Sequence, residues 1–470
     1  MTARLLLRGA TLITCDPELG CFERGDLLVE GGRIRAVGRD LGRIDCEVMD
    51  LGGKIVLPGL IDTHRHVWQT PLRGLGADWT VLDYLAAVRV KLAPLFSAPD
   101  VYQANYLGAL EALDLGVTTV VDFSHCINSP AHADAAIDGL EQAGIRALFC
   151  YGFADNAAGS PRDRFAHTSR TKQIEQLSAS RLCRAAGLVR MGVALTEMQV
   201  PWEQSRAELA CARELGLPIT LHCAAWPVPG MSEVERMSRE GLLGPDMLLV
   251  HCTHSGDEDL SRIADAGASI SATPETELQM GMGMPVVGRA LRKKVRTTLG
   301  CDVVCSNNGD PFAMMRLAMQ VERGLANAQA GLVERLELSV EKTLSMMTID
   351  AAHALGMSAE IGSLTAGKQA DLVILSTDTM NMTPLTPCGA ALVTQAHAGN
   401  VESVMVRGCF VKRGGKLLGV DVPAVQRSMG ATRDALLARA GGPALLLSER
   451  ANLLARWNMG QQPVGVGPSG

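Results

Sequence analysis

Short apolar runs alternate with longer helical stretches through the middle of the chain. The apolar runs lie at 116–124, 146–155, 189–197, 217–226, 247–256, 268–276 and 295–303. Between them, stretches such as 98–116 and 205–216 repeat apolar residues every three or four positions, which is typical of amphipathic helices. About eight strand–helix units predict a parallel sheet. Because the chain has no Gly-rich dinucleotide fingerprint, the pattern favours a closed (β/α)8 TIM barrel over an open doubly wound sheet.

The two ends of the chain have another pattern, with short strand-like runs separated by turns. Residues 1–57 contain such runs, and strands return over residues 362–422. A β segment of this size buries little core alone, so we expect both ends to pair into one small β-sandwich domain. The barrel then occupies residues 58–361, and residues 423–470 are expected to form a helical tail with a flexible terminus.

Composition narrows the class of protein. The 470 residues are 47% hydrophobic and 20% charged, with a net charge of −6, as in an ordinary globular enzyme. This charge predicts no nucleic-acid partner, and the absence of a long apolar window predicts no membrane span. The N-terminus reads as a strand rather than a signal peptide. The 13 cysteines are scattered without any CxxC pair, which favours a reducing compartment, so we expect the cytoplasm.

Two histidines stand one residue apart in "GLIDTHRHVWQTPLRG", directly after a short apolar run. On a strand, residues i and i+2 face the same side, so His64 and His66 point one way and Arg65 the other. Two imidazoles at a strand end suit a metal clamp. The alternative is a pair of ordinary polar residues in a loop.

Further polar residues end other predicted strands. In a barrel, the chemistry lies at the carboxyl ends of the strands, where His222, His251 and Asp302 are found. Each has a structural alternative, either a buried histidine or, for Asp302, a helix N-cap. Taken together with the histidine pair, they surround one point on the barrel axis. This set suits zinc or ferrous iron with room for a water molecule.

Several motifs resemble those of a known family. "PGLIDTHRH" resembles the first-strand signature of the amidohydrolase superfamily, and "LGCDVVCSNN" resembles its eighth-strand aspartate signature. "GSLTAGKQADLVIL" is similar to the return into the second β domain of that superfamily. "HRHVWQTPLRG" and "SNNGDPFAMMRLA" resemble the branch with the triazine hydrolases, 8-oxoguanine deaminase and adenosylhomocysteine deaminase. The resemblance covers about residues 5–420.

The resemblance implies a role for each strand-end residue. His64, His66, His222 and Asp302 would bind one divalent metal, Zn²⁺ or Fe²⁺. A single metal is implied because no lysine follows the fourth-strand run, where binuclear relatives carry a bridging carbamate. His251 would contact the hydrolytic water or the substrate, and Asp302 would also accept the proton of that water.

One position departs from the family pattern. Deaminases of this branch carry a glutamate three residues after the fifth-strand histidine, and it protonates the ring nitrogen of the substrate. This chain has Ala225 there, in "HCAAWP". Either another acid replaces the glutamate or the substrate needs no ring protonation. We expect Glu277 to be the substitute acid, with Glu197 and Glu275 as further candidates; for each, the alternative is a solvated loop carboxylate.

Substrate contacts are expected from the loops that follow the strands. Gln69 has a counterpart in 8-oxoguanine deaminase. For Trp226, the alternative is ordinary packing. Besides the carboxylates above, the candidates are Trp68, Gln69, Trp79, His125, Trp226 and His254.

The motifs predict a metal-dependent hydrolase that cleaves a non-peptide C–N bond in a small cyclic or heteroaromatic compound. Deamination is the leading reaction. Dechlorination or cyclic amide hydrolysis on an unusual metabolite is an alternative, and a non-catalytic binding homologue is the alternative from another class. The expected partners are a small-molecule substrate and a second copy of the chain, in a homodimer or higher homo-oligomer.

Overall fold

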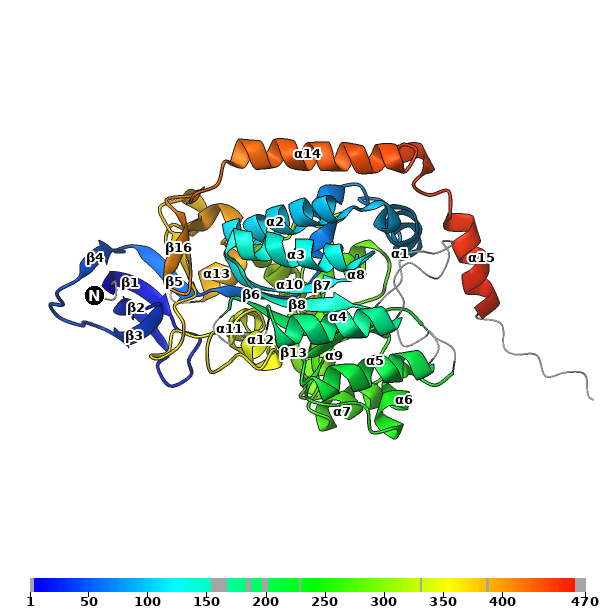
Figure 1. Ribbon diagram of the computed structural model, residues 1–470. Coiled ribbons are helices and arrows are strands. Elements are labelled where there is room, and N and C mark those ends of the chain that lie inside the picture. The colour runs from blue at the N-terminus through cyan, green and yellow to red at the C-terminus, as the bar shows by residue number, and fades with distance from the viewer. Residues whose placement is uncertain are drawn as a thin grey trace, which may run out of the picture.

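A barrel of eight parallel strands forms the centre of the molecule (Figure 1). The computed structural model describes residues 4–153, 167–182, 187–196, 202–227, 230–329, 332–385 and 389–460. Neighbouring strands of the barrel follow one another in the chain, as in repeated βα units. They are β6 (Leu60–Arg65), β7 (Val117–Ser124), β8 (Arg146–Gly152), β9 (Val189–Ala194), β10 (Ile219–Cys223), β11 (Met247–His251), β12 (Ser269–Ala272) and β13 (Arg296–Leu299).

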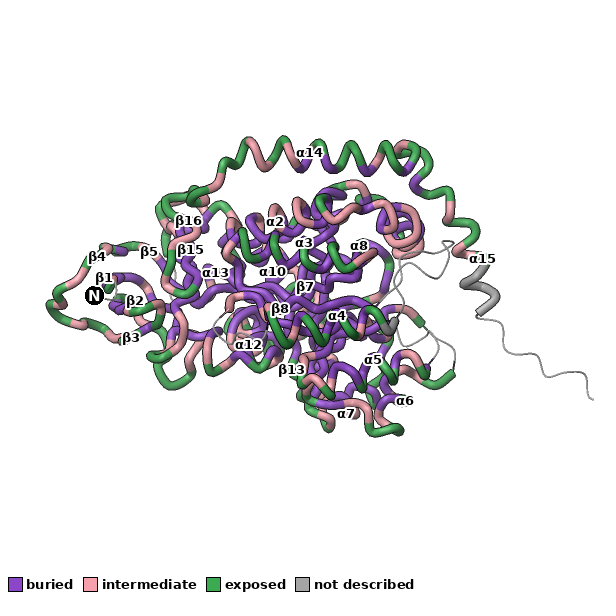
Figure 2. The backbone as a smooth tube through the Cα atoms, viewed as in Figure 1, coloured by how far each residue is buried: buried purple, intermediate pink, exposed green. Residues whose placement is uncertain are grey.

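The barrel strands are buried on both faces, because side chains fill the interior and helices cover the outside (Figure 2). This explains why the strands read as apolar runs in the sequence. The covering helices are α2 (Ala98–Asp114), α3 (Pro130–Ala143), α4 (His167–Ala179), α5 (Trp202–Glu214), α6 (Glu233–Arg239), α7 (Asp257–Asp265), α8 (Pro274–Gln279), α9 (Val287–Arg292), α10 (Pro311–Gln329), α11 (Val340–Ser345) and α12 (Ile349–Ala354).

The barrel closes between its last and first strands, beside the predicted metal ligands. The backbone N–H of Asp302 donates to the carbonyl of His64 at 2.8 Å, and that of His66 donates to the carbonyl of Asp302 at 2.9 Å. A single parallel bridge joins Arg65 to Asp302. Closure therefore fixes three predicted ligands relative to one another.

Both ends of the chain contribute to one mixed sheet beside the barrel, as predicted. β5 pairs with β14 in antiparallel register, Ile55 opposite Leu375 and Leu57 opposite Val373. An apolar core that includes Leu12, from the first strand of this sheet, fills the domain. The strands are β1 (Arg4–Ile13), β2 (Cys21–Glu30), β3 (Arg33–Gly38), β4 (Glu47–Asp50), β5 (Lys54–Pro58), β14 (Leu372–Ser376), β15 (Val401–Val406), β16 (Cys409–Arg413) and β17 (Lys416–Leu417).

A buried ion pair links this domain to the barrel. Arg146, at the start of β8, donates from Nε to Oδ2 of Asp371 at 2.8 Å and from Nη2 to Oδ1 at 3.1 Å. Both side chains are almost completely buried. The two units therefore pack as one body, with the short helix α13 (Ala390–Thr394) near their junction. We propose domain limits near residues 57, 361 and 422.

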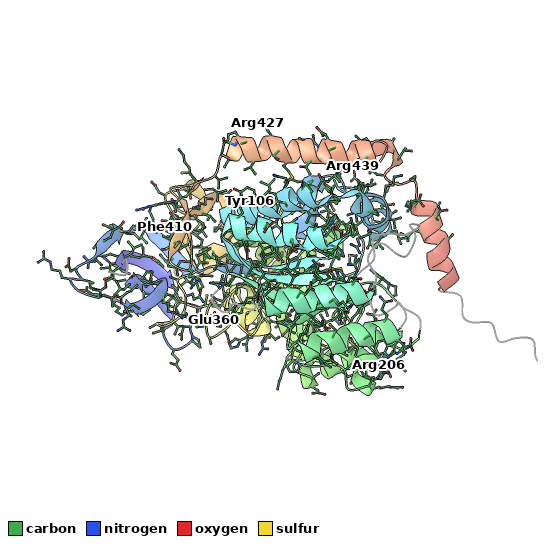
Figure 3. All side chains as sticks on the ribbon, viewed as in Figure 1. Tyr106, Arg206, Glu360, Phe410, Arg427 and Arg439 are labelled. Atoms are coloured by element: carbon green, nitrogen blue, oxygen red, sulfur yellow. The ribbon has the colours of Figure 1, made fainter. Side chains whose placement is uncertain are left out.

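Two helices follow the β domain and run back over the barrel helices (Figures 1 and 3). The helix α14 (Val422–Arg439) lies along α2, where Arg439 donates to Oδ2 of Asp100 at 2.6 Å. In α15 (Arg450–Gly460), Arg450 pairs with Asp83 of the short helix α1 (Val81–Tyr84). The helical tail is thus docked rather than detached, and the terminus predicted as flexible, 461–470, lies outside the described residues. No described helix is both long and apolar enough to cross a membrane.

Candidate active site and metal centre

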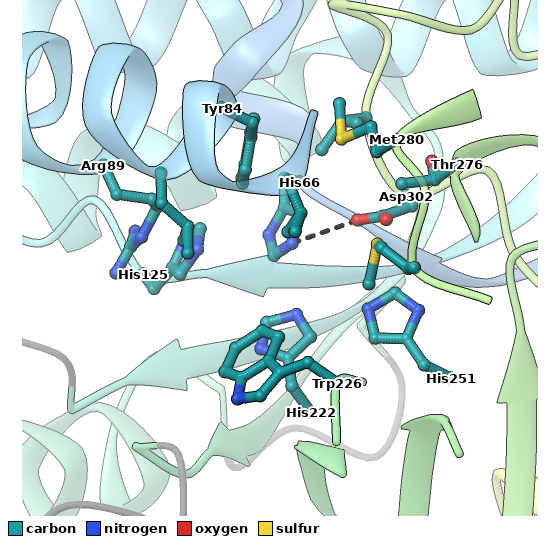
Figure 4. Close-up of a pocket in the computed structure, with 14 residues that line it drawn as sticks. His66, Tyr84, Arg89, His125, His222, Trp226, His251, Thr276, Met280 and Asp302 are labelled. Atoms are coloured by element: carbon teal, nitrogen blue, oxygen red, sulfur yellow. Dashed lines mark ion pairs between the residues drawn. The ribbon is translucent and has the colours of Figure 1, made fainter. Parts of the chain in front are cut away.

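Five of the predicted residues meet at the carboxyl ends of the barrel strands, and Figure 4 shows four of them, His66, His222, His251 and Asp302. His64 lies in β6 and His66 directly follows it. His222 lies in β10, His251 ends β11, and Asp302 lies just beyond β13. Residues from four separate strands therefore face one point at the top of the barrel, where this fold places its chemistry.

The distances among these side chains fit a metal ion. Oδ1 of Asp302 lies 3.2 Å from Nε2 of His64 and 3.3 Å from Nε2 of His66. Potential ligand atoms of these three residues lie within 4.8 Å of one another, and so do those of His64, His222 and His251. His64 belongs to both groups. The described residues thus offer a single, continuous set of nitrogen and oxygen ligands for one divalent cation.

Hydrogen bonds orient one of the imidazoles toward the common point. Nδ1 of His66 lies 3.0 Å from the carbonyl oxygen of Phe123. Because a carbonyl only accepts, Nδ1 carries the proton and Nε2 is left with a lone pair directed at Asp302. Metal-binding histidines in proteins are held in this way by a backbone carbonyl or a carboxylate.

The protonation states also fit a metal. Burial lowers the pKa of His64 well below its usual value, so this imidazole is neutral at pH 7. Burial opposes ionisation of Asp302, but the close approach of His64 and His66 outweighs that cost and lowers the pKa of the carboxyl group. Neutral imidazole and ionised carboxylate are the forms that coordinate metals. Moreover, Nδ1 of His64 is buried without a hydrogen-bond partner among the described residues.

Backbone strain is concentrated at the same strand ends. His251 has a φ of 72° and Asp302 a φ of 64°, both in the left-handed region that residues other than glycine seldom adopt. Cys252, next to His251, has a φ of 56°. Strain of this kind is found where function requires a side chain in a fixed direction.

His251 faces the site with a carboxylate behind it. Its Nδ1 lies 3.0 Å from Oγ1 of Thr273 and 3.4 Å from Oε1 of Glu277. The same Oε1 accepts a hydrogen bond from the backbone N–H of Thr273 at 2.8 Å. Glu277 is completely buried in α8 and does not line the cavity described below. Glu277 therefore contacts His251, which lines the cavity, but Glu277 itself does not reach the cavity.

A cavity opens over four of the five strand-end residues, with about 440 Å³ of empty space that includes open solvent at its mouth. Its lining combines imidazoles, one carboxylate and apolar walls. The lining residues are His66, Val81, Tyr84, Leu85, Arg89, His125, His222, Trp226, His251, Thr276, Met280, Met282, Asp302 and Val303.

Four of the predicted substrate contacts lie in the cavity wall or directly behind it. His125 and Trp226 line the cavity, and the ring of His125 stacks on that of His66 with centroids 4.3 Å apart. Trp68 stands behind His125 and donates from Nε1 to its Nδ1 at 2.9 Å. Gln69 donates from Nε2 to the hydroxyl of the lining residue Tyr84 at 2.7 Å. Trp68 and Gln69 thus support lining residues.

Other predicted residues lie elsewhere. Trp79 packs on the hydrophobic core without lining the cavity. His254 is exposed, and its Nε2 lies 2.9 Å from the carbonyl of Met282. Glu275 is half-buried outside the cavity lining, and burial raises its pKa to about 7. Glu197 lies outside the described residues.

The sequence prediction missed the segment that covers the cavity. Tyr84 ends α1, and Leu85 and Arg89 lie in the π-helix η2 (Leu85–Leu92), which follows it directly. In "VLDYLAAVRVKL" these residues read as one more amphipathic helix. The only local signal was the charge of Arg89, and Asp83 and Lys91 are charged residues of the same stretch.

Comparisons with known proteins agree with this geometry. The sequence profile of the amidohydrolase family matches residues 55–411. A 5-methylthioadenosine/S-adenosylhomocysteine deaminase from Symbiobacterium thermophilum is 28% identical over 432 residues, covering 87% of this chain and 93% of the relative. A 5′-deoxyadenosine deaminase from Methanosarcina barkeri is 26% identical over 455 residues, covering 93% and 99%.

Solved structures share the fold. An adenosine deaminase from Xanthomonas campestris with bound zinc superimposes with a TM-score of 0.82 at 23% identity, covering 92% of this chain and 98% of that one. An atrazine chlorohydrolase from Arthrobacter aurescens complexed with zinc gives 0.80 at 23% identity, covering 91% and 100%. The profile match over most of the chain shows that the protein belongs to the amidohydrolase family, hydrolases of carbon–nitrogen bonds other than peptide bonds.

Proposed function

We propose that the protein is a metal-dependent aminohydrolase that removes an amino group from a small heteroaromatic compound. The observation that carries the proposal is the convergence of His64, His66 and Asp302, with His222 and His251 beside them. The full-length relatives named above are deaminases of adenosine derivatives. Zinc is the proposed metal, because the solved relatives contain it.

The proposed roles follow from the positions of the side chains. His64, His66, His222 and Asp302 would hold the metal, which when bound lowers the pKa of a coordinated water to roughly 7. Asp302, with its pKa held low, accepts the proton of the attacking water. His251 orients that water and stabilises the charge that develops on the substrate.

Glu277 supports His251 in this scheme. Its Oε1 lies 3.4 Å from Nδ1 of His251, so it holds this imidazole in place. Asp302, which takes the proton of the attacking water, returns it to the departing amino group. Glu277, the expected substitute acid, therefore has a positioning role.

A second reaction deserves a test because Ala225 replaces the usual glutamate and Asp302 is the only carboxylate among the described lining residues. A ring opening or dechlorination needs no protonation of a ring nitrogen by that glutamate. Incubating zinc-loaded protein with amino-heterocycles, chloro-triazines and cyclic amides distinguishes the reactions. Ammonia release supports the aminohydrolase, whereas absorbance change or chloride release without ammonia supports the alternative.

We also propose that the protein works in the cytoplasm as a homo-oligomer. Ten of the described cysteines, among them Cys15 and Cys46, are free thiols, which suits a reducing compartment. Exposed apolar side chains such as Leu332 and Met380 offer surface for self-association. Light scattering of the purified protein tests the oligomer, and fractionation of the source cells tests the location.

A further inference from the structure

An arginine lines the cavity from the π-helix that covers it. Arg89 follows Leu85 by four residues on η2, so both side chains lie on the face that lines the cavity (Figure 4). In Figure 4, Arg89 lies beside His125, which stacks on the predicted metal ligand His66. A fixed positive charge thus stands near the predicted metal centre.

Arg89 is half-buried and differs from the buried arginines of the structure in what it contacts. Arg65 pairs with Glu111, and Arg146 makes two hydrogen bonds to Asp371. No ion pair joins Arg89 to a carboxylate of the described residues, and its Nη1 is buried there without a hydrogen-bond partner. A guanidinium does not lose its proton in proteins, and a buried N–H donor without a partner is unfavourable. The described residues therefore leave Nη1 of Arg89 to be matched by something else.

The other described residues that line the cavity do not supply the missing anion. Asp302 is the only carboxylate among the described lining residues, and it faces His64 and His66 in the predicted ligand set. Ala225 removes the acid that the branch usually carries nearby. A divalent cation held by Asp302 and neutral imidazoles would add further positive charge. The cavity therefore favours a substrate that is itself negative.

The remaining wall suits a flat ring. Val81, Leu85, Met280, Met282 and Trp226 supply aliphatic, thioether and indole surface around the strand ends. Apolar walls with a few fixed polar groups are typical of sites for small aromatic ligands. Ring stacking and burial would position the heterocycle, and Arg89 would fix its orientation.

We propose that Arg89 binds a carboxylate carried by the substrate, so that the substrate class is an anionic heterocycle. The inference rests on the proposed function for the reaction but concerns recognition only. A guanidinium donates two parallel N–H bonds to a carboxylate, which gives orientation as well as affinity. In this arrangement Arg89 is a specificity-determining residue.

Calorimetric binding to the zinc-loaded protein tests the proposal. The probes are 2-aminopyrimidine-5-carboxylate, 5-aminopyrazine-2-carboxylate and the matching neutral carboxamides. The proteins are the wild type, Arg89→Met, Arg89→Lys and the control Lys91→Met, which removes a cation from the same helix outside the cavity lining. Metal content and melting temperature are measured for each, so that a folding defect is recognised separately.

We expect the wild type to bind the better carboxylate about 10- to 100-fold more tightly than its carboxamide, as for a charge-assisted hydrogen bond. Arg89→Met should lose that preference, Arg89→Lys should keep part of it, and Lys91→Met should keep it fully. A carboxylate attracted only by the metal would still be preferred by Arg89→Met, and that result overturns the proposal. Equal binding of each pair by the wild type, or no binding of either carboxylate, also overturns it.

Ammonia release is measured separately with the same compounds. Carboxylate preference that depends on Arg89, without ammonia release from any amino-heterocycle, would support the recognition site and count against the proposed aminohydrolase. Ammonia release from neutral amino-heterocycles that does not depend on Arg89 would support the proposed aminohydrolase and count against the recognition site.

Discussion

His251 can be a metal ligand or a group that acts on the water and the substrate. It lies near the predicted metal ligands, and its Nδ1 contacts Thr273 and Glu277. We predict that His251→Ala keeps its metal and loses about 10²- to 10⁴-fold in turnover, the usual effect of removing an acid–base or charge-stabilising group. Metal analysis beside steady-state kinetics checks this. If the variant loses metal as His222→Ala does, His251 is a ligand.

Glu277 should act through His251, given its 3.4 Å approach to Nδ1 and its place outside the cavity lining. Glu277→Gln is therefore expected to lower kcat with little change in KM or metal content. In the His251→Ala background the same substitution should have almost no further effect, because the group it supports is gone. Glu275→Gln is the matched control. Additive losses in the double variant would show that Glu277 acts independently of His251.

The sequence could predict those site residues whose side chain can bind a metal and whose position directly follows a predicted strand. His64, His222 and Asp302 each follow an apolar run, and a parallel barrel brings the ends of such runs together. Arg89 could not be found in this way. Its neighbours indicate only a helix, and the absence of a partner carboxylate among the described residues is visible only in three dimensions.

At the scale of elements, the contact between β13 and β6 sets the geometry of the predicted ligands. Gly300, just after β13, lies so close to β6 that an added Cβ would meet the backbone N and O of His64 at 2.7 Å. We predict that Gly300→Ala destabilises the protein by roughly 1–3 kcal/mol, as overpacking typically does, and weakens metal binding. Chemical denaturation and metal titration measure the two effects.

Gly324→Ala in α10 is the control for that variant, because nothing lies within 4 Å of the Cβ it would add. It should leave metal binding unchanged and stability equal or slightly higher, since alanine favours a helix over glycine. Normal metal affinity in Gly300→Ala would show that the β13–β6 contact does not position the ligands.

The elements themselves were largely predictable, for a physical reason. Strands buried on both faces must be apolar, so the barrel strands stand out in the sequence, and β7 is buried along its whole length. The π-helix η2 was not predictable, because its apolar spacing resembles that of an α-helix. The pairing of the two chain ends was predicted because both contain short strand-like runs. That β5 pairs with β14, and in which register, emerged only from the structure.

At the scale of the whole molecule, the buried pair Arg146–Asp371 joins the barrel to the β domain. Arg146→Met should cost about 3–5 kcal/mol of unfolding free energy, because it leaves a buried carboxylate without its partner. The double variant Arg146→Met/Asp371→Asn should recover part of that loss, since the charge is then removed. Denaturation of the single and double variants measures the coupling, and purely additive losses would contradict it.

We propose that His64, His66, His222 and Asp302 hold one divalent metal on which the enzyme depends. Elemental analysis of the freshly purified protein tests this, with His66→Ala, Asp302→Ala and His251→Ala prepared alongside. We expect about one equivalent of metal per chain in the wild type and in His251→Ala, and almost none in the other two variants. Two equivalents per chain, both needed for activity, or a full equivalent retained by His66→Ala, would contradict it.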